Sequence, residues 1–217
     1  MSAPPLRRTI AILPVKRFEL AKTRLGDALS IAQRRRLARA MVADVLDALL
    51  AAPELDGVTV VTNEGAVAAL ARDAGAVVLA EPHESGQSAA ALIGIGHALG
   101  GGFDRALLVP GDCPALDGAT LRALLEPVPA APAVTIVADR HGSGTNALLL
   151  DPPDAIEPGF GEGSFERHHE RARAAGAAWH VAALPGLALD IDTPSDLAAL
   201  RGALAGPRTT AVLGALR

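Results

Sequence analysis

Aromatic residues and cysteine are scarce in this sequence: tyrosine is absent, and four phenylalanines, one tryptophan and one cysteine occur in 217 residues. A single cysteine excludes an internal disulfide bond and is typical of proteins of the reducing cytosol. Because half of the residues are hydrophobic and only 2% are aromatic, a core must be built mainly from alanine, valine and leucine. Long apolar runs are missing too, since no stretch reaches the ~18 residues of a membrane span and residues 1–8 lack the apolar region of a signal peptide. We therefore expect a cytoplasmic protein without membrane segments.

The formal net charge is -4. A slightly acidic balance argues against non-specific binding to nucleic acid or to anionic membranes. The length suffices for one large α/β domain with a sizeable core, and the sequence shows neither an internal repeat nor a linker between domains. We therefore expect residues 1–217 to form a single domain.

Short apolar runs alternate with segments of helical periodicity. The apolar runs predict strands over residues 9–15, 58–61, 76–79, 106–109, 133–138, 147–150 and 178–181. Helices are predicted over residues 31–52, 65–74, 89–99, 118–125, 166–175 and 197–204. Ser30 is expected to cap the first helix and Pro53 to end it. Such alternation is typical of an α/β fold with a mainly parallel sheet and helices on both faces.

A candidate catalytic residue stands where one predicted strand stops. The apolar run 106–109 ends at Pro110-Gly111, which cannot continue a central strand, and Asp112 follows. In open α/β sheets, ligands bind beyond the carboxyl ends of the strands, so Asp112 is expected at a ligand site. A nucleophilic role for the adjacent Cys113 is the weaker interpretation, because no histidine forms a recognisable catalytic signature with it.

A second acidic pair, Asp190 and Asp192, follows the apolar residues 187–189. If residues 187–189 form a strand that continues, both carboxylates face the same side; the alternative is a turn whose acids cap the next helix. With Asp112 the pair offers three carboxylates and few nearby histidines, a ligand set that suits a hard cation such as Mg²⁺. The sequence therefore predicts a magnesium site at Asp112, Asp190 and Asp192.

Basic residues cluster directly after the first predicted strand, where four cations fall within the nine residues 16–24. Lys16, Lys22 and Arg24 are predicted to surround a polyphosphate; the alternative is a solvated helix face. Cations beside a metal at the carboxyl edge of a sheet, without a Walker loop, favour nucleotidyl transfer, in which an acceptor anion attacks an α-phosphorus and pyrophosphate leaves. Such a site needs positioning and charge neutralisation more than a nucleophilic side chain.

Two loops rich in glycine and hydrogen-bond donors are further candidates for ligand binding. One covers residues 139–146, and the other covers residues 160–165, with Gly161 in its turn and Ser164 predicted as a helix N-cap. Helix N-termini and such loops bind phosphate or carboxylate, although an ordinary glycine turn and cap is an equally open alternative. His97, His168 and His169 are expected at the surface of helices.

Several motifs, in order along residues 10–200, resemble those of the family of 2-phospho-L-lactate and phosphoenolpyruvate guanylyltransferases. They are Pro14-Val15-Lys16 with Ala21-Lys22-Thr23-Arg24-Leu25, Pro110-Gly111-Asp112, Gly144-Thr145-Asn146-Ala147-Leu148, residues 160–165 with His168, and Asp190-Ile191-Asp192-Thr193-Pro194. The resemblance implies a single-domain, Rossmann-like fold of the nucleotide-diphosphosugar-transferase type, with three layers and a mainly parallel mixed sheet. It also implies that Asp112, Asp190 and Asp192 hold Mg²⁺ and that Thr145, Gly161 and Ser164 hold a phosphorylated acid.

The loop Gly86-Gln87-Ser88 departs from the Gly-Leu-Asn of the family. The resemblance places this loop near the nucleotide, together with Lys16, Lys22 and Arg24. The guanine preference therefore rests on the family and not on this loop.

The predicted activity is transfer of GMP from GTP to phosphoenolpyruvate with release of pyrophosphate, the family's step in coenzyme F-420 biosynthesis. Phosphoenolpyruvate is favoured because the alanine- and arginine-rich composition resembles that of high-GC bacterial proteins, and bacterial members tend to use this acid; 2-phospho-L-lactate and 3-phospho-D-glycerate stay open. A molybdenum-cofactor or sugar nucleotidyltransferase also stays open as an alternative, although Pro14-Val15-Lys16 replaces the glycine-rich first loop of those enzymes. A non-catalytic nucleotide-binding protein is a further open alternative. The expected partners are GTP and the acid, without nucleic acid or membrane, and a homodimer is an open assembly state.

Overall fold

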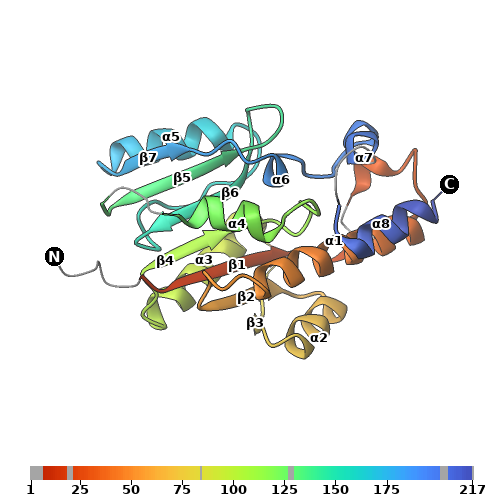
Figure 1. Cartoon of the computed structure of the whole chain (residues 1–217), viewed down its shortest axis with the longest axis horizontal. Helices are drawn as coiled ribbons and strands as arrows, with labels where there is room; N and C mark the ends of the chain where they lie inside the picture. The colour runs from red at the N-terminus through yellow and green to blue at the C-terminus, as the bar shows by residue number, and fades with distance from the viewer. Residues whose placement is uncertain (1–6, 19–21, 84, 127–129, 201–204, 217) are drawn as a thin grey trace.

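The structure, a computed structural model, describes residues 7–18, 22–83, 85–126, 130–200 and 205–216. In that part of the chain, seven strands form one sheet (Figure 1). The strands are β1 (Thr9–Val15), β2 (Gly57–Thr62), β3 (Val77–Leu79), β4 (Arg105–Leu108), β5 (Ala133–Ala138), β6 (Thr145–Asp151) and β7 (Ala178–Val181). All seven predicted strands are confirmed, and their ends differ from the prediction by two residues at most.

The sheet is mixed but mainly parallel, in the order β3-β2-β1-β4-β6-β5-β7. β1 pairs in parallel with β2 on one side and with β4 on the other, whereas β6 runs antiparallel to both β4 and β5. Residues 9–13 of β1 are buried on both faces of the sheet, which explains their unbroken apolar run. Because β6 is reversed, its first residues lie at the same edge of the sheet as the carboxyl ends of β1 and β4.

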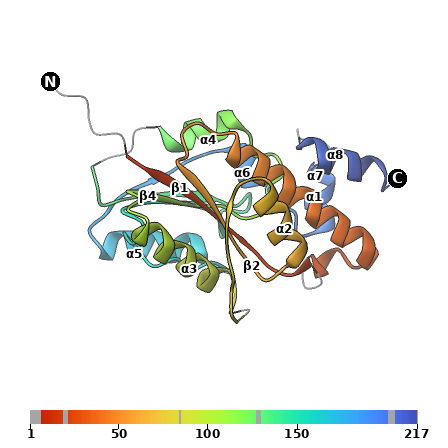
Figure 2. The ribbon, with the colours of Figure 1, turned by 90° about the horizontal axis from the view of Figure 1, so that it is seen from below.

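Helices cover both faces of the sheet, as predicted. In chain order they are α1 (Ile31–Leu50), α2 (Gly65–Asp73), α3 (Gln87–Gly100), α4 (Gly118–Leu125), α5 (Ser164–Ala174), α6 (Pro185–Ala188), α7 (Pro194–Leu200) and α8 (Pro207–Gly214), with a 3-10 turn, η2 (Thr23–Leu25), before α1. α1, α2 and α4 pack on one face, around Leu46, Val67 and Leu121, and α3 and α5 pack on the other, around Ile95 and Ala172 (Figure 2). None of the helices in the described part of the chain is long and apolar enough to span a bilayer.

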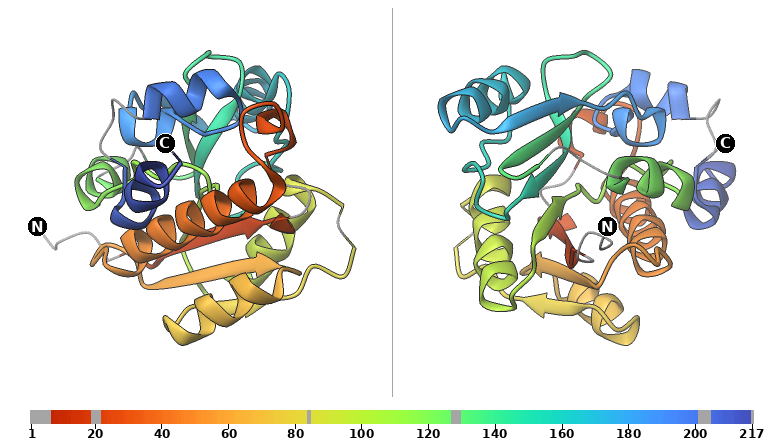
Figure 3. Two further views of the ribbon diagram at one scale, coloured as in Figure 1. Left: turned by 90° about the vertical axis from the view of Figure 1, so that its right-hand side faces the viewer. Right: turned by 60° about the vertical axis from the view of Figure 1, so that its left-hand side comes forward.

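A third, smaller cluster joins the first half of α1 to α7 and α8 at one end of the molecule (Figure 3). Leu37 and Met41 of α1 pack there against Leu25, Ile191 and Leu200. Leu25 comes from the basic segment after β1, and Ile191 lies between the two acids of the Asp-x-Asp pair. The cluster therefore holds both segments against α1, near the carboxyl edge of the sheet.

The start of α1 agrees with the local sequence signal, whereas the helices near the C-terminus differ from the prediction. Ser30 caps α1 in a capping box with Gln33, as its side chain predicts. α7 begins at Pro194, and residues 201–204 of the predicted last helix lie outside the described residues. α8 was not predicted; its first N–H groups are accepted by Asp44, a residue of α1 far away in the sequence (3.1 and 2.7 Å).

Candidate active site

The predicted nucleotide and metal segments meet at the edge of the sheet formed by the carboxyl ends of β1 and β4. A cleft of about 340 Å³ lies there. It is lined by predicted site residues from four separate segments: Lys16, Lys22, Arg24, Gly86, Gln87, Asp112 and Asp192. The fold thus gathers cations and acids around one cavity.

Asp112 is placed by the abrupt end of β4. The Val109 N–H still donates to β1 (3.0 Å), after which Pro110 and Gly111 turn the chain out of the sheet. Gly111 passes so close to α1 that a Cβ there would lie 2.8 Å from Val42 Cγ2, so any larger residue would have to displace the Val42 side chain. The turn leaves Asp112 Oδ1 buried and without a hydrogen-bond partner among the described residues.

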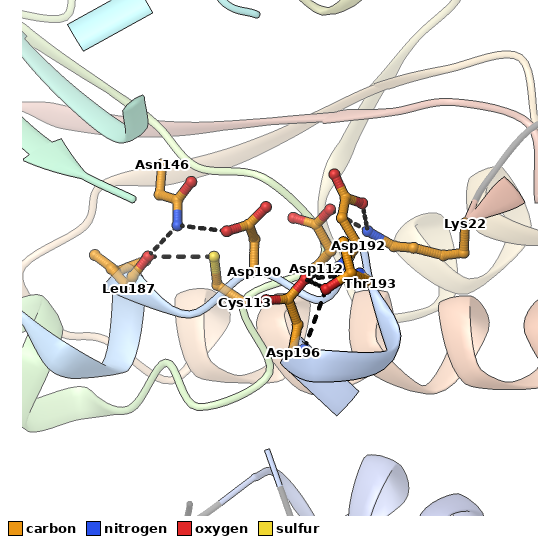
Figure 4. Close-up of polar contacts among 9 residues, drawn as sticks. All are labelled: Lys22, Asp112, Cys113, Asn146, Leu187, Asp190, Asp192, Thr193 and Asp196. Carbon is orange, nitrogen blue, oxygen red and sulfur yellow. Dashed lines mark hydrogen bonds and ion pairs between the residues drawn. The ribbon is translucent and has the colours of Figure 1, made fainter. Parts of the chain in front are cut away.

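Asp190 and Asp192 converge with Asp112. One carboxylate oxygen from each of the three residues lies within 4.8 Å of the others (Figure 4). Fully buried Ile191 anchors the segment between the two acids, and its N–H donates to the Asp112 carbonyl (3.2 Å). A backbone hydrogen bond therefore fixes the acidic pair against the turn that carries Asp112.

Of the two local geometries left open for this pair, the strand is not observed. Residues 187–189 form no strand, because the short helix α6 covers Pro185–Ala188 and irregular chain follows. A proline at the first helical position favours this local outcome, since its fixed φ suits a helix start. The two acids therefore meet Asp112 through the burial of Ile191 and not through the alternation of a strand.

Asn146 is a site residue to which the sequence analysis gave no role. It lies in β6, which begins at Thr145, earlier than predicted, so both residues belong to the sheet and not to the preceding loop. The Asn146 Nδ2 donates to Asp190 Oδ1 (3.2 Å) and to the Leu187 carbonyl (2.8 Å). Asn146 thereby orients the Asp190 carboxylate, and its place in the Gly-Thr-Asn motif was the available signal.

Asp196 is a second residue that the sequence analysis missed. Its Oδ2 accepts the N–H groups of Asp192 (3.1 Å) and Thr193 (2.6 Å), and the Thr193 Oγ1 accepts the Asp196 N–H in return (3.3 Å). Burial raises the pKa of Asp196, but the hydrogen bonds from Thr193 and the charge of Arg140 outweigh burial and hold it below its ordinary value. The Thr-x-x-Asp spacing, a variant of the capping box, predicts this role of fixing the backbone at Asp192.

Lys22 lies between two of the three acids. Its ammonium forms ion pairs with Asp112 and with Asp192, the latter at 2.8 Å. Burial lowers the pKa of Lys22, but the charges of Asp112 and Asp192 outweigh burial and raise it above its ordinary value. Lys22 also has φ 56°, the one positive φ among the described residues other than glycine. Such a strained backbone persists only where the surroundings fix it.

The acidic cluster can accept a further cation. Burial first, and then the negative charge of Asp112, raise the pKa of Asp190. A positive charge next to Asp190 would therefore be favourable. Asp112 Oδ1 is buried without a partner among the described residues, and the three side chains offer oxygen ligands only. These properties fit a hard divalent cation, and Asp112, Asp190 and Asp192 are the residues that could hold it.

The residues predicted to hold an acid are absent from the lining of the cleft. Thr145 donates its N–H to Ser164 Oγ (2.9 Å), and Gly161 has φ 107°. Ser164 is not the N-cap of α5: Gly163 is, with φ 67°, and Ser164 is the first residue of the helix. The serine hydroxyl therefore binds the start of β6 instead of capping its own helix.

The surface position predicted for His168 is wrong, because the side chain is 0% exposed. Its Nδ1 lies 2.9 Å from Thr145 Oγ1, and its Nε2 accepts the Gly159 N–H (2.8 Å). Burial, followed by the charges of Arg171 and Arg167, lowers its pKa to about 4. His97 and His169 are partly exposed.

The loop before α3 has two environments. Gly86 is the N-cap of α3 with φ 101°, and Gly86 and Gln87 line the cleft, so the positive end of the helix dipole faces it. Ser88 instead accepts the Phe160 N–H (2.9 Å) and joins α3 to the loop before α5.

Cys113 is fully buried, its thiol lies 3.4 Å from the Leu187 carbonyl, and burial raises its pKa. These properties exclude the nucleophile interpretation.

Residues 9–211 match the family described as Guanylyl transferase CofC like. The chain belongs to this family. It is 48% identical over 201 residues to a phosphoenolpyruvate guanylyltransferase of Conexibacter woesei, covering 92% of this chain and 90% of that protein. A protein of the same name from Sphaerobacter thermophilus is 41% identical over 194 residues, covering 89% and 93%.

Solved structures agree on the fold. A Desulfovibrio desulfuricans structure described as a nucleotide-diphospho-sugar transferase superposes with a TM-score of 0.72 at 19% identity, covering 96% of each chain. A nucleotidyl transferase from Methanothermobacter superposes with a TM-score of 0.64 at 22% identity, covering 90% of this chain and 96% of that one. The predicted nucleotide-diphosphosugar-transferase-like fold, mainly parallel and mixed, is confirmed.

Proposed function

We propose that the chain transfers GMP from GTP to phosphoenolpyruvate, in one nucleotidyltransferase domain over residues 1–217. The observation that supports this best is the convergence of Asp112, Asp190 and Asp192 beside a cleft that Lys16 and Arg24 line; one Asp112 oxygen is buried and has no partner among the described residues. Family membership gives the reaction class, and the names of the relatives from Conexibacter and Sphaerobacter support the acceptor. Following the family resemblance, we place this step in coenzyme F-420 biosynthesis in the cytoplasm.

In this proposal the cleft binds the triphosphate of GTP. Lys16 and Arg24 are exposed in the cleft and neutralise phosphate charge, and the start of α3 adds N–H donors at Gly86 and Gln87. Asp112, Asp190 and Asp192 would hold Mg²⁺, which when bound would neutralise phosphate charge. Lys22 stays near its two acids and supplies a further positive charge.

The reaction needs no nucleophilic side chain. A phosphate oxygen of the acceptor acid forms a new bond to the α-phosphorus of GTP, and the bond between that phosphorus and the bridging oxygen of the β-phosphate breaks. The electron pair of the broken bond leaves with pyrophosphate. Because the attacking oxygen is already an anion, no general base is required, which agrees with the burial of Cys113. Thr145, Gly161 and Ser164 are proposed to hold the acid, and Asn146 to keep Asp190 in place.

Pyrophosphate release from purified protein tests this function. The chain is incubated with phosphoenolpyruvate and each of the four nucleoside triphosphates in turn, with Mg²⁺ or with EDTA. We expect release with GTP and Mg²⁺, little with the other nucleotides, and none with EDTA. Asp190→Asn serves as the inactive control. Equal release with all four nucleotides would contradict the guanine preference, and release in EDTA would contradict the role of the metal.

A homodimer remains a prediction that light scattering can test.

A further inference from the structure

His168 is a buried polar residue that the proposed reaction does not use. It lies in the second turn of α5, is 0% exposed, and packs edge-on against Phe160, with ring centroids 5.3 Å apart. Each of its ring nitrogens has a partner: the Gly159 backbone nitrogen at 2.8 Å from Nε2, and Thr145 Oγ1 at 2.9 Å from Nδ1. A histidine buried in this way has a fixed pattern of donors and acceptors.

The direction of both hydrogen bonds follows from one of them. A backbone N–H can only donate, so Nε2 of His168 accepts from Gly159 and carries no proton. In a neutral ring the proton then belongs to Nδ1, which donates to Thr145 Oγ1. Burial and the neighbouring charges of Arg171 and Arg167 keep the ring neutral, since they lower its pKa to about 4.

Thr145 Oγ1 thereby becomes an obligatory donor. Its oxygen accepts from His168, so its own hydrogen is free for a further acceptor. Ser164 is in the same condition, because its Oγ accepts the Thr145 N–H (2.9 Å). Among the described residues, neither hydroxyl forms a further hydrogen bond. Both side chains are buried, at 7% and 1% exposure, where a donor without an acceptor is costly.

We propose that His168 is a positioning residue that fixes the Thr145 hydroxyl as a donor, so that Thr145 and Ser164 form a pair of donors that selects a fully ionised oxyanion of the acceptor acid. The inference rests on the proposed function, because it concerns the acid that accepts the guanylyl group. An oxyanion accepts from both hydroxyls, whereas a protonated acid or an amide brings a donor of its own that finds no acceptor there. Asn146, the next residue of β6, contacts Asp190 (3.2 Å).

Two substitutions separate this role from simple anchoring of the loop. His168→Asn places an amide N–H near the position of Nδ1 and keeps the donor to Thr145, but it loses the acceptor for Gly159. His168→Gln places an amide oxygen near Nε2 and keeps the acceptor, but it loses the donor. We expect His168→Gln to raise the KM for phosphoenolpyruvate by about tenfold or more, and His168→Asn by about threefold at most, with GTP binding unchanged in both.

A double-substitution series gives the matched control. In a Thr145→Val background, His168→Gln should raise the KM no further, since the hydroxyl that His168 positions is gone. If His168→Asn impairs acid binding and His168→Gln does not, or if both impair it equally, His168 acts through the loop or through packing and the proposal is overturned. Thermal unfolding shows whether each variant is folded.

A measurement on the unsubstituted chain keeps the inference testable even if a variant does not fold. Long-range ¹H–¹⁵N spectra distinguish the two neutral forms of histidine, and we expect the Nδ1–H form for His168. The Nε2–H form would overturn the proposal even if guanylyl transfer is intact. The two proposals can fail separately. If the wild type makes no guanylylated product, the proposed function is contradicted. The donor pair would still be supported if His168 has the Nδ1–H form and His168→Gln binds inorganic phosphate more weakly than the wild type.

Discussion

Replacing Lys22 by methionine removes the positive charge that lies between Asp112 and Asp192, and we expect it to destabilise the protein. Removing one partner of a buried ion pair costs about 3–5 kcal/mol. The Lys22 side chain is 6% exposed, but those of Asp112 and Asp192 are 26% and 46% exposed. Because water can solvate the two carboxylates again, we expect a smaller loss of about 1–3 kcal/mol in the free energy of unfolding.

The same substitution should strengthen metal binding in the absence of nucleotide. In the wild type a metal ion must compete with the Lys22 ammonium for Asp112 and Asp192. In Lys22→Met the three acids keep their mutual repulsion, which is about 3 kcal/mol for two unit charges 4.8 Å apart at an effective dielectric constant of ~20. A divalent cation relieves this repulsion, so we expect the Kd for Mg²⁺ to fall about tenfold, a change of ~1.4 kcal/mol.

Urea unfolding with and without Mg²⁺, together with titration calorimetry, checks both effects. Mg²⁺ should raise the unfolding midpoint more in Lys22→Met than in the wild type, because a ligand that binds the folded chain more tightly stabilises it more. Lys16→Met is the matched control, since Lys16 is exposed in the same cleft and should leave stability and metal affinity unchanged. A Lys22→Met variant that is as stable as the wild type and binds Mg²⁺ no better would refute this reasoning.

Further predictions concern the other parts of the site. Asp190→Asn should lower turnover at saturating Mg²⁺ by at least ~10²-fold, comparable to the loss of one preorganised electrostatic group; near-normal turnover with an intact circular dichroism spectrum would remove Asp190 from the site. Arg24→Ala should weaken GTP binding by about 1.5–3 kcal/mol in calorimetry, and an unchanged affinity would show that Arg24 is merely solvated. Ser164→Ala should raise the KM of the acid and leave GTP binding intact; the reverse pattern in steady-state kinetics would contradict its role. The pKa of His168 lies at about 4 and not near its ordinary 6.5, so the unfolded chain binds a proton that the folded chain does not. Stability should therefore fall by about 3 kcal/mol as the pH drops from about 6.5 to 4. In urea titrations His168→Gln should lose that contribution, and equal pH slopes in both proteins would count against it.

Local signals were sufficient for most of the fold. The strands and the start of α1 were predictable because each depends on neighbours in the sequence: unbroken apolar runs for residues 9–13 of β1, and a capping box for Ser30. The position of Asp112 was also predictable, since Pro110 and Gly111 end β4 at the ligand edge of the sheet.

Long-range contacts determine what the sequence did not reveal. The convergence of Asp190 and Asp192 depends on the burial of Ile191 against α1, and not on the strand that was one interpretation of their spacing. The interior position of His168 depends on its partners Thr145 and Gly159. A charged or polar residue in a helical pattern gives no sign of such partners, because they are brought to it only by the complete fold.

Competition among three acids tests the central claim most directly. Equal amounts of phosphoenolpyruvate, 2-phospho-L-lactate and 3-phospho-D-glycerate are offered together with GTP and Mg²⁺, and the products are identified by mass. The account predicts guanylylated phosphoenolpyruvate as the main product, together with pyrophosphate, and its disappearance in Asp190→Asn. A clear preference for phospholactate or phosphoglycerate would contradict the proposed acceptor, and the absence of any nucleotidylated acid would contradict the proposed activity as a whole.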